Sequence, residues 1–279
     1  MTTTLPAPAT RVRPQTLTRA VHSEWIKTRS LRSTWVGMAA VAVVMIGFGA
    51  IASAVSTGSV QPPGPGGSDG GGPFGGGGPL STVLTGSTFA VLLIGVLGSL
   101  AGAREYGSRM ITASVVSVPR RWQVVVAKAV ALSAAVIPTA LIAVLGSYAA
   151  GTAILSANDA PTASLTDDDV LTTLFGMVGY ITAIALIGLG LGILLRSVAG
   201  SIGAVVGGIL ILPNIAGALL PDSWDTILRF LPSSAASAFT AVAAAGDSKL
   251  GAAAGVAVLA IWVAAAVVAA VVSLSRRDV

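Results

Sequence analysis

The chain has 279 residues, of which 54% are hydrophobic and only 10% are charged, and its mean hydropathy is +0.87. Soluble proteins carry about 25% charged residues, so this composition indicates an integral membrane protein. The sequence has no cysteine and a single histidine, His22, which excludes disulfide bonds, thiolate sites and a histidine-based metal cluster. The net charge of +5 does not indicate nucleic-acid binding, because the basic residues flank apolar runs.

The N-terminal region divides into two parts. Residues 1–15 are rich in Thr, Pro and Ala, which favours a disordered cytoplasmic tail. In residues 16–33, apolar residues recur near helical spacing among basic ones. Trp25 and these basic side chains suit a helix along the membrane surface, although Ile26 falls on the polar side. A plain basic flank before a span is an equal alternative.

Six apolar runs are predicted to form transmembrane helices, since crossing the hydrocarbon core takes about 20 helical residues. They cover about 34–55, 81–103, 124–155, 170–195, 202–220 and 250–274. The first run could instead be a signal peptide, because Ala52-Ser53-Ala54 imitates a cleavage site, but it is longer than a signal-peptide core. The sequence therefore predicts an all-α fold with a six-helix transmembrane domain over residues 34–279.

Glycine and proline mark special positions within these spans. Three glycine pairs spaced four residues apart predict close helix packing: Gly98 with Gly102, Gly188 with Gly192, and Gly203 with Gly207. The third span is interrupted by Pro138, and the fifth contains Pro213, where proline frees a backbone carbonyl and predicts a bend. The short turn after Arg196 makes the fourth and fifth spans antiparallel neighbours.

The connecting segments differ in composition. Residues 56–80 are rich in Gly and Pro without lysine or arginine, which predicts a flexible external loop. Their glycine run is not a phosphate-binding loop, because the chain lacks GxxxxGK[ST]. The acidic loop containing Asp159 and 167–169 lacks calcium-loop spacing and is interpreted as a solvated external face.

A helical hairpin is predicted before the last span, over residues 221–248. Asp222 can cap a first short helix, which Pro232 stops, and Ser233 or Ser234 can cap a second helix that continues to Ala245. This segment is too short to span the membrane twice. We therefore expect an extracytoplasmic re-entrant hairpin that enters the outer leaflet.

The distribution of lysine and arginine predicts the orientation. Fourteen of them flank one side of the spans, and only Arg229 and Lys249 fall on the other, which places both termini in the cytoplasm. Lys128 is counted with the cytoplasmic flanking charges, and no Asp, Glu, Lys, Arg or His is assigned to the membrane core. This pattern argues against an ion-coupled transporter and against an intramembrane hydrolase.

The segment from Arg104 to Lys128 lies between the second and third spans and is rich in charge. One interpretation is an ordinary cytoplasmic loop, in which the arginines fix orientation and Trp122 anchors at the lipid headgroups. The other interpretation is a short helix presented to a partner protein.

Three features together resemble the permease subunit of type-2 ABC exporters, a family that includes daunorubicin-resistance-like drug exporters. They are the stretch SEWIKTRSLRSTW before the first span, the stretch REYGSRMITASVVSVPRRWQVVVAK after the second, and the hairpin before the last. The resemblance implies that residues 16–33 form the connecting helix and that a coupling helix lies within residues 105–118. The connecting-helix residues would be Glu24, Trp25, Lys27 and Arg32, and the ATPase-coupling residues would be Arg104, Glu105, Tyr106, Arg109, Arg120 and Arg121.

The resemblance also implies a function. The chain would export a hydrophobic or amphiphilic cargo, such as a drug, antibiotic, lipid or glycan, across a bacterial plasma membrane. It would have no enzymatic activity of its own, because ATP and Mg would be bound by a separate ATPase subunit. A second permease subunit would complete the pathway, and the turn 196–201 would make a smaller contact with the ATPase. The alternative is a membrane scaffold or immunity protein that transports nothing.

Overall fold

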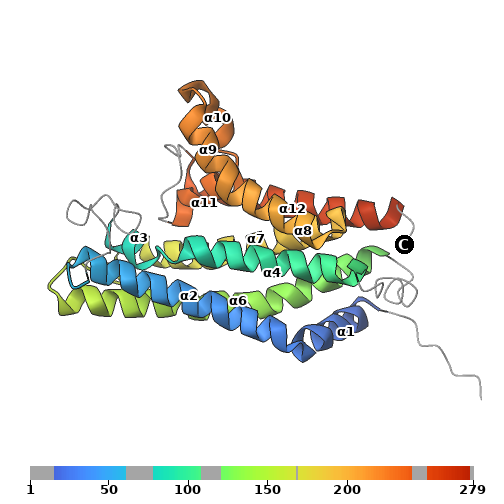
Figure 1. The fold of residues 1–279 in the computed structure, drawn as a ribbon, viewed down its shortest axis with the longest axis horizontal. Coiled ribbons are helices and arrows are strands. Elements are labelled where there is room, and N and C mark those ends of the chain that lie inside the picture. Colours follow the sequence, from blue (N-terminus) through green and yellow to red (C-terminus); the bar gives the residue numbers. More distant parts are fainter. Residues whose placement is uncertain (1–15, 61–77, 108–120, 168, 241–249, 277–279) are drawn as a thin grey trace, which may run out of the picture.

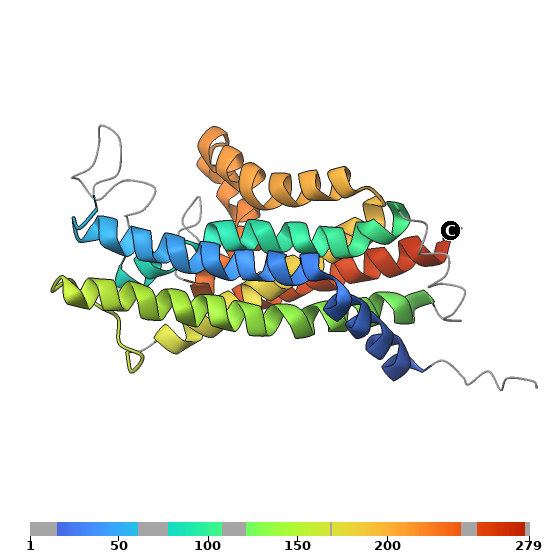
Figure 2. The same ribbon diagram turned by 60° about the horizontal axis from the view of Figure 1, so that its bottom comes forward.

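The computed structural model describes residues 16–60, 78–107, 121–167, 169–240 and 250–276. Every regular element in these ranges is a helix, and five helices are long and apolar enough to cross a membrane. They lie roughly along one direction as an elongated bundle, with the short helix α1 at one end (Figures 1 and 2). The all-α, membrane-like fold predicted from composition is thus confirmed.

The spanning helices are α2, α4, α6, α7 and α12. In chain order the helical elements are α1 (Leu17–Ser30), α2 (Arg32–Ser56), α3 (Pro79–Val83), α4 (Ser87–Gly107), α6 (Arg121–Ala157), α7 (Val170–Leu195), α8 (Val198–Val206), the π-helical turn η1 (Gly207–Ile211), α9 (Leu212–Leu219), the 3-10 turn η2 (Asp222–Trp224), α10 (Asp225–Leu228), α11 (Pro232–Thr240) and α12 (Ala252–Arg276).

Helix α7 is the centre of the bundle. It contacts α4, α6, α8, α11 and α12, and Met177, Ile181, Ile184 and Leu189 are among its fully buried side chains. Its sequence is apolar on all sides, which is the pattern of a helix surrounded by other helices. Each of the other spanning helices has a face with exposed apolar residues, and these faces suit contact with lipid.

Two of the three predicted glycine pairs pack against each other. A Cβ atom added to Gly98 would collide with the Ala185 carbonyl oxygen, and one added to Gly192 would lie 2.5 Å from the Ser99 carbonyl oxygen. Gly102 and Gly188 are similarly enclosed, so the backbones of α4 and α7 touch directly. The third pair is different, because Gly203 and Gly207 have open space where a side chain would project. The packing prediction for that pair is wrong.

The predicted fifth span is not a single straight helix. Residues 198–219 are helical, but the π-helical turn η1 interrupts them just before Pro213, where the Leu212 N–H donates to the Gly207 carbonyl. Helix α8 packs on α4 and α7, whereas α9 diverges from the bundle (Figure 1). The expected irregularity around Pro213 is therefore present as a π-turn.

The second and third spans also depart from prediction. Residues 81–86, assigned to the second span, belong to the short helix α3 and a turn, and the span itself begins at Ser87. Helix α3 is held between α2 and α6, where the Ser147 hydroxyl donates to the carbonyl oxygens of Val83 at 2.6 Å and Met45 at 3.2 Å. Pro138 does not interrupt the third span, since α6 is continuous for 37 residues.

Of the predicted hairpin, the two short helices are present, their predicted bounds are wrong, and entry into the outer leaflet stays a prediction. Two short helices do precede α12, yet Pro232 is the first residue of α11 and does not end α10. Helix α11 packs between α7 and α12, and the Trp262 Nε1–H donates to the Phe230 carbonyl at 2.8 Å. The predicted continuation to Ala245 lies outside the described residues.

The glycine contact leads to a stability prediction with an internal control. Gly192→Ala should lower the free energy of unfolding by about 1–3 kcal/mol, because its methyl group would force α4 and α7 apart. Gly203→Ala, in open space on α8, should be neutral or slightly stabilising, since alanine is the better helix former. Thermal unfolding of both variants in one detergent checks this, and equal effects would contradict the packing argument.

Candidate functional site

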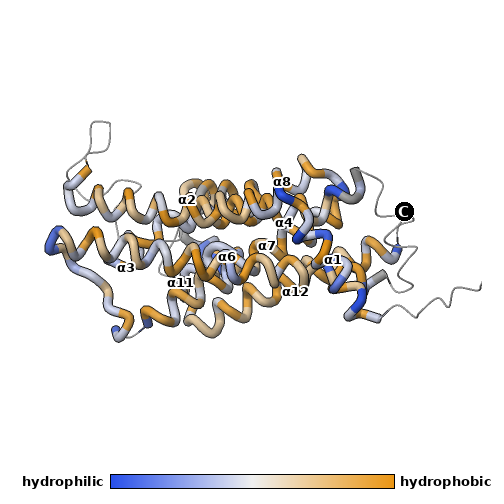
Figure 3. The backbone as a smooth tube through the Cα atoms, turned by 90° about the horizontal axis from the view of Figure 1, so that it is seen from below, coloured by the Kyte–Doolittle hydropathy of each residue, from blue (hydrophilic) through white to orange (hydrophobic). Residues whose placement is uncertain are grey.

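The two ends of the bundle carry opposite charge. Nine of the ten lysines and arginines within the described ranges belong to the end near α1: Arg19, Lys27, Arg29, Arg32, Arg104, Arg121, Lys128, Arg196 and Arg276. The tenth, Arg229, follows α10 away from that end (Figure 1). The blue, hydrophilic segments in Figure 3 gather at the ends, with the apolar spans between them. We call the end near α1 the basic end.

Helices α1 and α2 form a sharp elbow at the basic end. Leu31 alone separates them, with extended backbone angles of φ −81° and ψ 103°. The Trp35 Nε1–H donates across the elbow to the Arg29 carbonyl oxygen at 3.1 Å. Beyond the elbow α1 packs against α6, and Trp25 lies against the hydrophobic core.

Glu24 on α1 and Lys128 on α6 form a buried ion pair. The Lys128 Nζ lies 2.9 Å from Glu24 Oε2, and the two residues are only 7% and 6% exposed. The Lys27 Nζ lies 2.6 Å from the other carboxylate oxygen, Oε1, from one turn along α1. The carboxylate of Glu24 is therefore held between two ammonium groups, and it joins α1 to α6.

The electrostatic surroundings keep Glu24 ionised. Burial by itself raises the pKa of this carboxyl group, because it disfavours the charged form. The charge of Lys128 and the hydrogen bonds from Lys27 and Lys128 outweigh that effect, so the pKa of Glu24 lies below its ordinary value. The carboxylate of Glu24 is thus charged at neutral pH.

Lys128 corrects the assignment made from sequence. The flanking position predicted for Lys128 is wrong, because this lysine lies inside α6, about two turns after Arg121, and is buried. A signal for this was available, because a lysine within an apolar helix needs a partner and Glu24 is one of the few acidic residues on the same side. Sequence patterns do not show that Glu24 is this partner, because the two residues are 104 positions apart in the chain.

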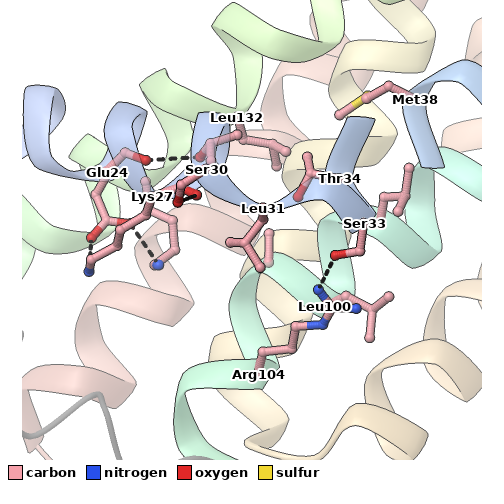
Figure 4. A pocket seen from close by; sticks show the side chains of 14 residues that line it. Glu24, Lys27, Ser30, Leu31, Ser33, Thr34, Met38, Leu100, Arg104 and Leu132 are labelled. Atoms are coloured by element: carbon pink, nitrogen blue, oxygen red, sulfur yellow. Dashed lines mark hydrogen bonds and ion pairs between the residues drawn. The ribbon is translucent and has the colours of Figure 1, made fainter. Parts of the chain in front are cut away.

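A cavity of about 590 Å³ lies beside this ion pair, enclosed by α1, α2, α4 and α6. Figure 4 shows Glu24 and Lys27 on one side of it and Arg104 on the other. The Arg104 Nη1 donates to the Ser33 hydroxyl at 3.3 Å, which links the end of α4 to the first turn of α2. Leu97, Leu100 and Leu132 give the cavity an apolar floor.

Tyr106 and Arg196 meet at the same end of the bundle. The guanidinium carbon of Arg196 lies 5.1 Å from the centre of the Tyr106 ring, a cation–π distance. Arg196 ends α7 in the left-handed conformation, with φ 52°, and this backbone turn begins the connection to α8. The contact joins the ends of α4 and α7.

The predicted site residues are therefore brought together only in part. Glu24, Lys27 and Arg104 line one cavity, Tyr106 contacts Arg196, and Trp25 packs into the core. Arg32 is exposed at the start of α2. Glu105 lies in α4 and Arg121 begins α6, while Arg109 and Arg120 lie outside the described residues. Ser33 and Lys128 are members of the site that the sequence-based assignment omitted.

Within the described ranges, no group of three or more His, Asp or Glu side chains is placed to hold a metal ion. Comparison of the sequence with protein-family models and with curated proteins finds no match. The arrangement at the basic end is therefore the basis for a functional proposal.

The buried ion pair predicts unequal effects for two lysines. Lys128→Met should lower the free energy of unfolding by about 3–5 kcal/mol, because it leaves the Glu24 carboxylate without its buried partner. Lys27→Met should cost less than about 1 kcal/mol, since Lys27 is 38% exposed. Chemical unfolding in detergent checks both values. Adding Glu24→Gln to Lys128→Met should recover most of the loss, and a purely additive double variant would contradict the pairing.

The lowered pKa of Glu24 predicts an acid-dependent loss of stability. A carboxyl group whose folded pKa is depressed contributes stability above its ordinary pKa of about 4.5 and loses it as the pH falls through the folded value. The free energy of unfolding should therefore fall more steeply on acidification in the wild type than in the Glu24→Gln/Lys128→Met double variant. Thermal unfolding measured from about pH 6 to about pH 3 checks this, and parallel curves would show that Glu24 contributes nothing.

Proposed function

We propose that this chain is the permease subunit of an ATP-driven exporter, in the manner of the type-2 ABC family that it resembles. The observation that carries the proposal is the arrangement of the basic end. Helix α4 ends there at Gly107, and α6 begins there at Arg121, close to α1 (Figure 1). The expected coupling helix belongs to the connection between these two ends, and most of it lies outside the described residues.

The contacts around this segment would transmit force from a docked partner. Arg104 at the end of α4 contacts Ser33 on α2, and Lys128 near the start of α6 is paired with Glu24 on α1. Tyr106 carries the connection on to α7 through Arg196. A partner that moved the α4–α6 connection would therefore act on α1, α2 and α7 as well, which is what coupling to an ATPase requires.

The distribution of ionisable groups supports an external energy source. Among the described residues of the five spanning helices, Lys128 is the only buried lysine, arginine, aspartate or glutamate, and it is paired near one end of α6. Ion-coupled transporters place such groups at depth to bind the driving ion. The chain also lacks a GxxxxGK[ST] motif, so ATP and Mg would be bound by a partner subunit.

The remaining parts of the proposal follow from the apolar spans. An uncharged pathway suits a hydrophobic or amphiphilic cargo, such as a drug, antibiotic, lipid or glycan conjugate. The charge bias supports a cytoplasmic position for the basic end and both termini, and the family resemblance supports the bacterial plasma membrane. A second permease subunit would complete the pathway, and the exposed apolar residues of the diverging helix α9, Leu212, Ile215 and Leu219, are available for such a contact.

Co-purification tests this proposal directly. The tagged full-length chain, extracted from native membranes in mild detergent, should elute with an ATPase subunit in stoichiometric amount. Glu105→Lys at the basic end should leave membrane insertion intact but abolish recovery of the ATPase and the stimulation of its ATP hydrolysis, because it reverses charge at the docking face. Asp225→Lys makes the same charge change on α10, away from that end, and should have no effect.

Two outcomes would overturn the exporter proposal. The first is elution of the chain alone or with membrane proteins that do not hydrolyse ATP, which would favour the scaffold or immunity alternative. The second is equal behaviour of Glu105→Lys and Asp225→Lys, with ATPase recovery retained in both, which would place the docking face elsewhere.

A further inference from the structure

The cavity between α1, α2, α4 and α6 combines two kinds of surface. Its floor is apolar and is formed by Met38, Leu97, Leu100 and Leu132 from three helices. Its polar side carries Lys27 and Arg104 at the rim and the buried Lys128 beside Glu24, so the lining has three positive charges against one carboxylate. A site of this type suits a ligand with an anionic head and an apolar chain.

The first turn of α2 adds to the positive character of the rim. Ser33 and Thr34 of this turn line the cavity, α2 has no side-chain cap at its N-terminus, and no acidic residue occurs in its first turn. The N-terminal end of a 25-residue helix carries a partial positive charge. The Thr34 N–H of this turn already donates to the Leu31 carbonyl oxygen at 3.0 Å, which leaves the N–H groups before it for a ligand. Arg104 lies across from this turn and already donates to Ser33, so both groups face the same point (Figure 4).

Tryptophans indicate the depth of the cavity in the membrane. Three of the five tryptophans, Trp25, Trp35 and Trp122, lie on α1, at the start of α2 and at the start of α6. Trp35 and Trp122 are 44% and 42% exposed. Tryptophan concentrates at the level of the lipid headgroups, so the rim of the cavity lies where phosphate groups are found and its floor points toward the acyl region.

We propose that this cavity binds one anionic phospholipid. Arg104, Ser33 and the first turn of α2 bind the phosphate, and the acyl chain lies along Met38, Leu97, Leu100 and Leu132. Glu24 does not oppose this binding, because its carboxylate is turned to Lys27 and Lys128 on the far side of the cavity (Figure 4). The bound lipid would touch α2, α4 and α6 at once. Lipid binding at this site can be tested without the proposed ATPase partner.

Native mass spectrometry of the full-length chain in a neutral detergent tests the proposal. Titration with dioleoylphosphatidylglycerol should give a single tight binding event that dioleoylphosphatidylcholine does not give. Arg104→Gln should weaken it about tenfold, the expected loss for one charge-assisted hydrogen bond. Arg29→Gln is the matched control, because Arg29 is exposed at the same end and does not line the cavity. Its binding should equal that of the wild type.

A second variant separates the shape of the cavity from its charge. Ala101→Phe places a ring in the cavity without changing the charge, and it should weaken phosphatidylglycerol binding. A thermal unfolding transition like that of the wild type should show that the variant is folded. Equal binding of the two lipids, or equal weakening by Arg29→Gln and Arg104→Gln, would overturn the proposal. The proposal would also be overturned if inorganic phosphate displaced phosphatidylglycerol with an equal affinity, because the apolar floor would then contribute nothing to lipid binding.

Discussion

The direct contact between the backbones of α4 and α7 determines how the bundle is arranged. Gly98, Gly102, Gly188 and Gly192 let the two helices approach until the glycine of one meets a carbonyl oxygen or Cα atom of the other. In a membrane, apolar side chains gain little from facing one another instead of lipid, so close packing of small residues supplies much of the association energy. Helix α7 then offers its other faces to α6, α8, α11 and α12. The bundle is therefore assembled around a pair of helices with very little side chain between them.

The basic end is organised by a different interaction, the ion pair between Glu24 and Lys128. Removing two charges from water has a large energetic cost, which the attraction between them and the second hydrogen bond from Lys27 must offset. Such a pair is a poor source of net stability but a strong determinant of position, because neither charge tolerates burial without the other. We therefore expect the pair to fix where α1 lies on α6.

The sequence predicted some parts of this structure well, for identifiable reasons. Long apolar runs predict helices because a spanning backbone must satisfy its own hydrogen bonds, and this reasoning located five of the spans. The glycine pairs on α4 and α7 were visible because their spacing matches one helical face. The pair at Gly203 and Gly207 has the same spacing and no close neighbour, so spacing alone does not distinguish a contact from a coincidence.

Other features depended on tertiary structure. Helix α3 is stabilised by a hydrogen bond from Ser147 on α6 to the Val83 carbonyl oxygen, which no local pattern near residues 79–83 reveals. The partner of Lys128 lies 104 positions away, and the lysine follows so closely on basic neighbours that it resembled a topology signal. Of the expected site, the clustering of charge at one end was predictable from the flanking residues. The cavity was not, because it exists only where α1, α2, α4 and α6 meet.

The elbow at Leu31 has a mechanical consequence. Helices α1 and α2 are joined by one non-helical residue, α1 is tied to α6 by Glu24 and Lys128, and α2 packs along α6 for much of its length. Each of these three helices is thus connected to the other two, and this arrangement opposes sliding of one helix along another. We therefore expect the ends of α1, α2 and α6 to move together. Larger displacement is expected of α9, which follows the π-turn and has few neighbours.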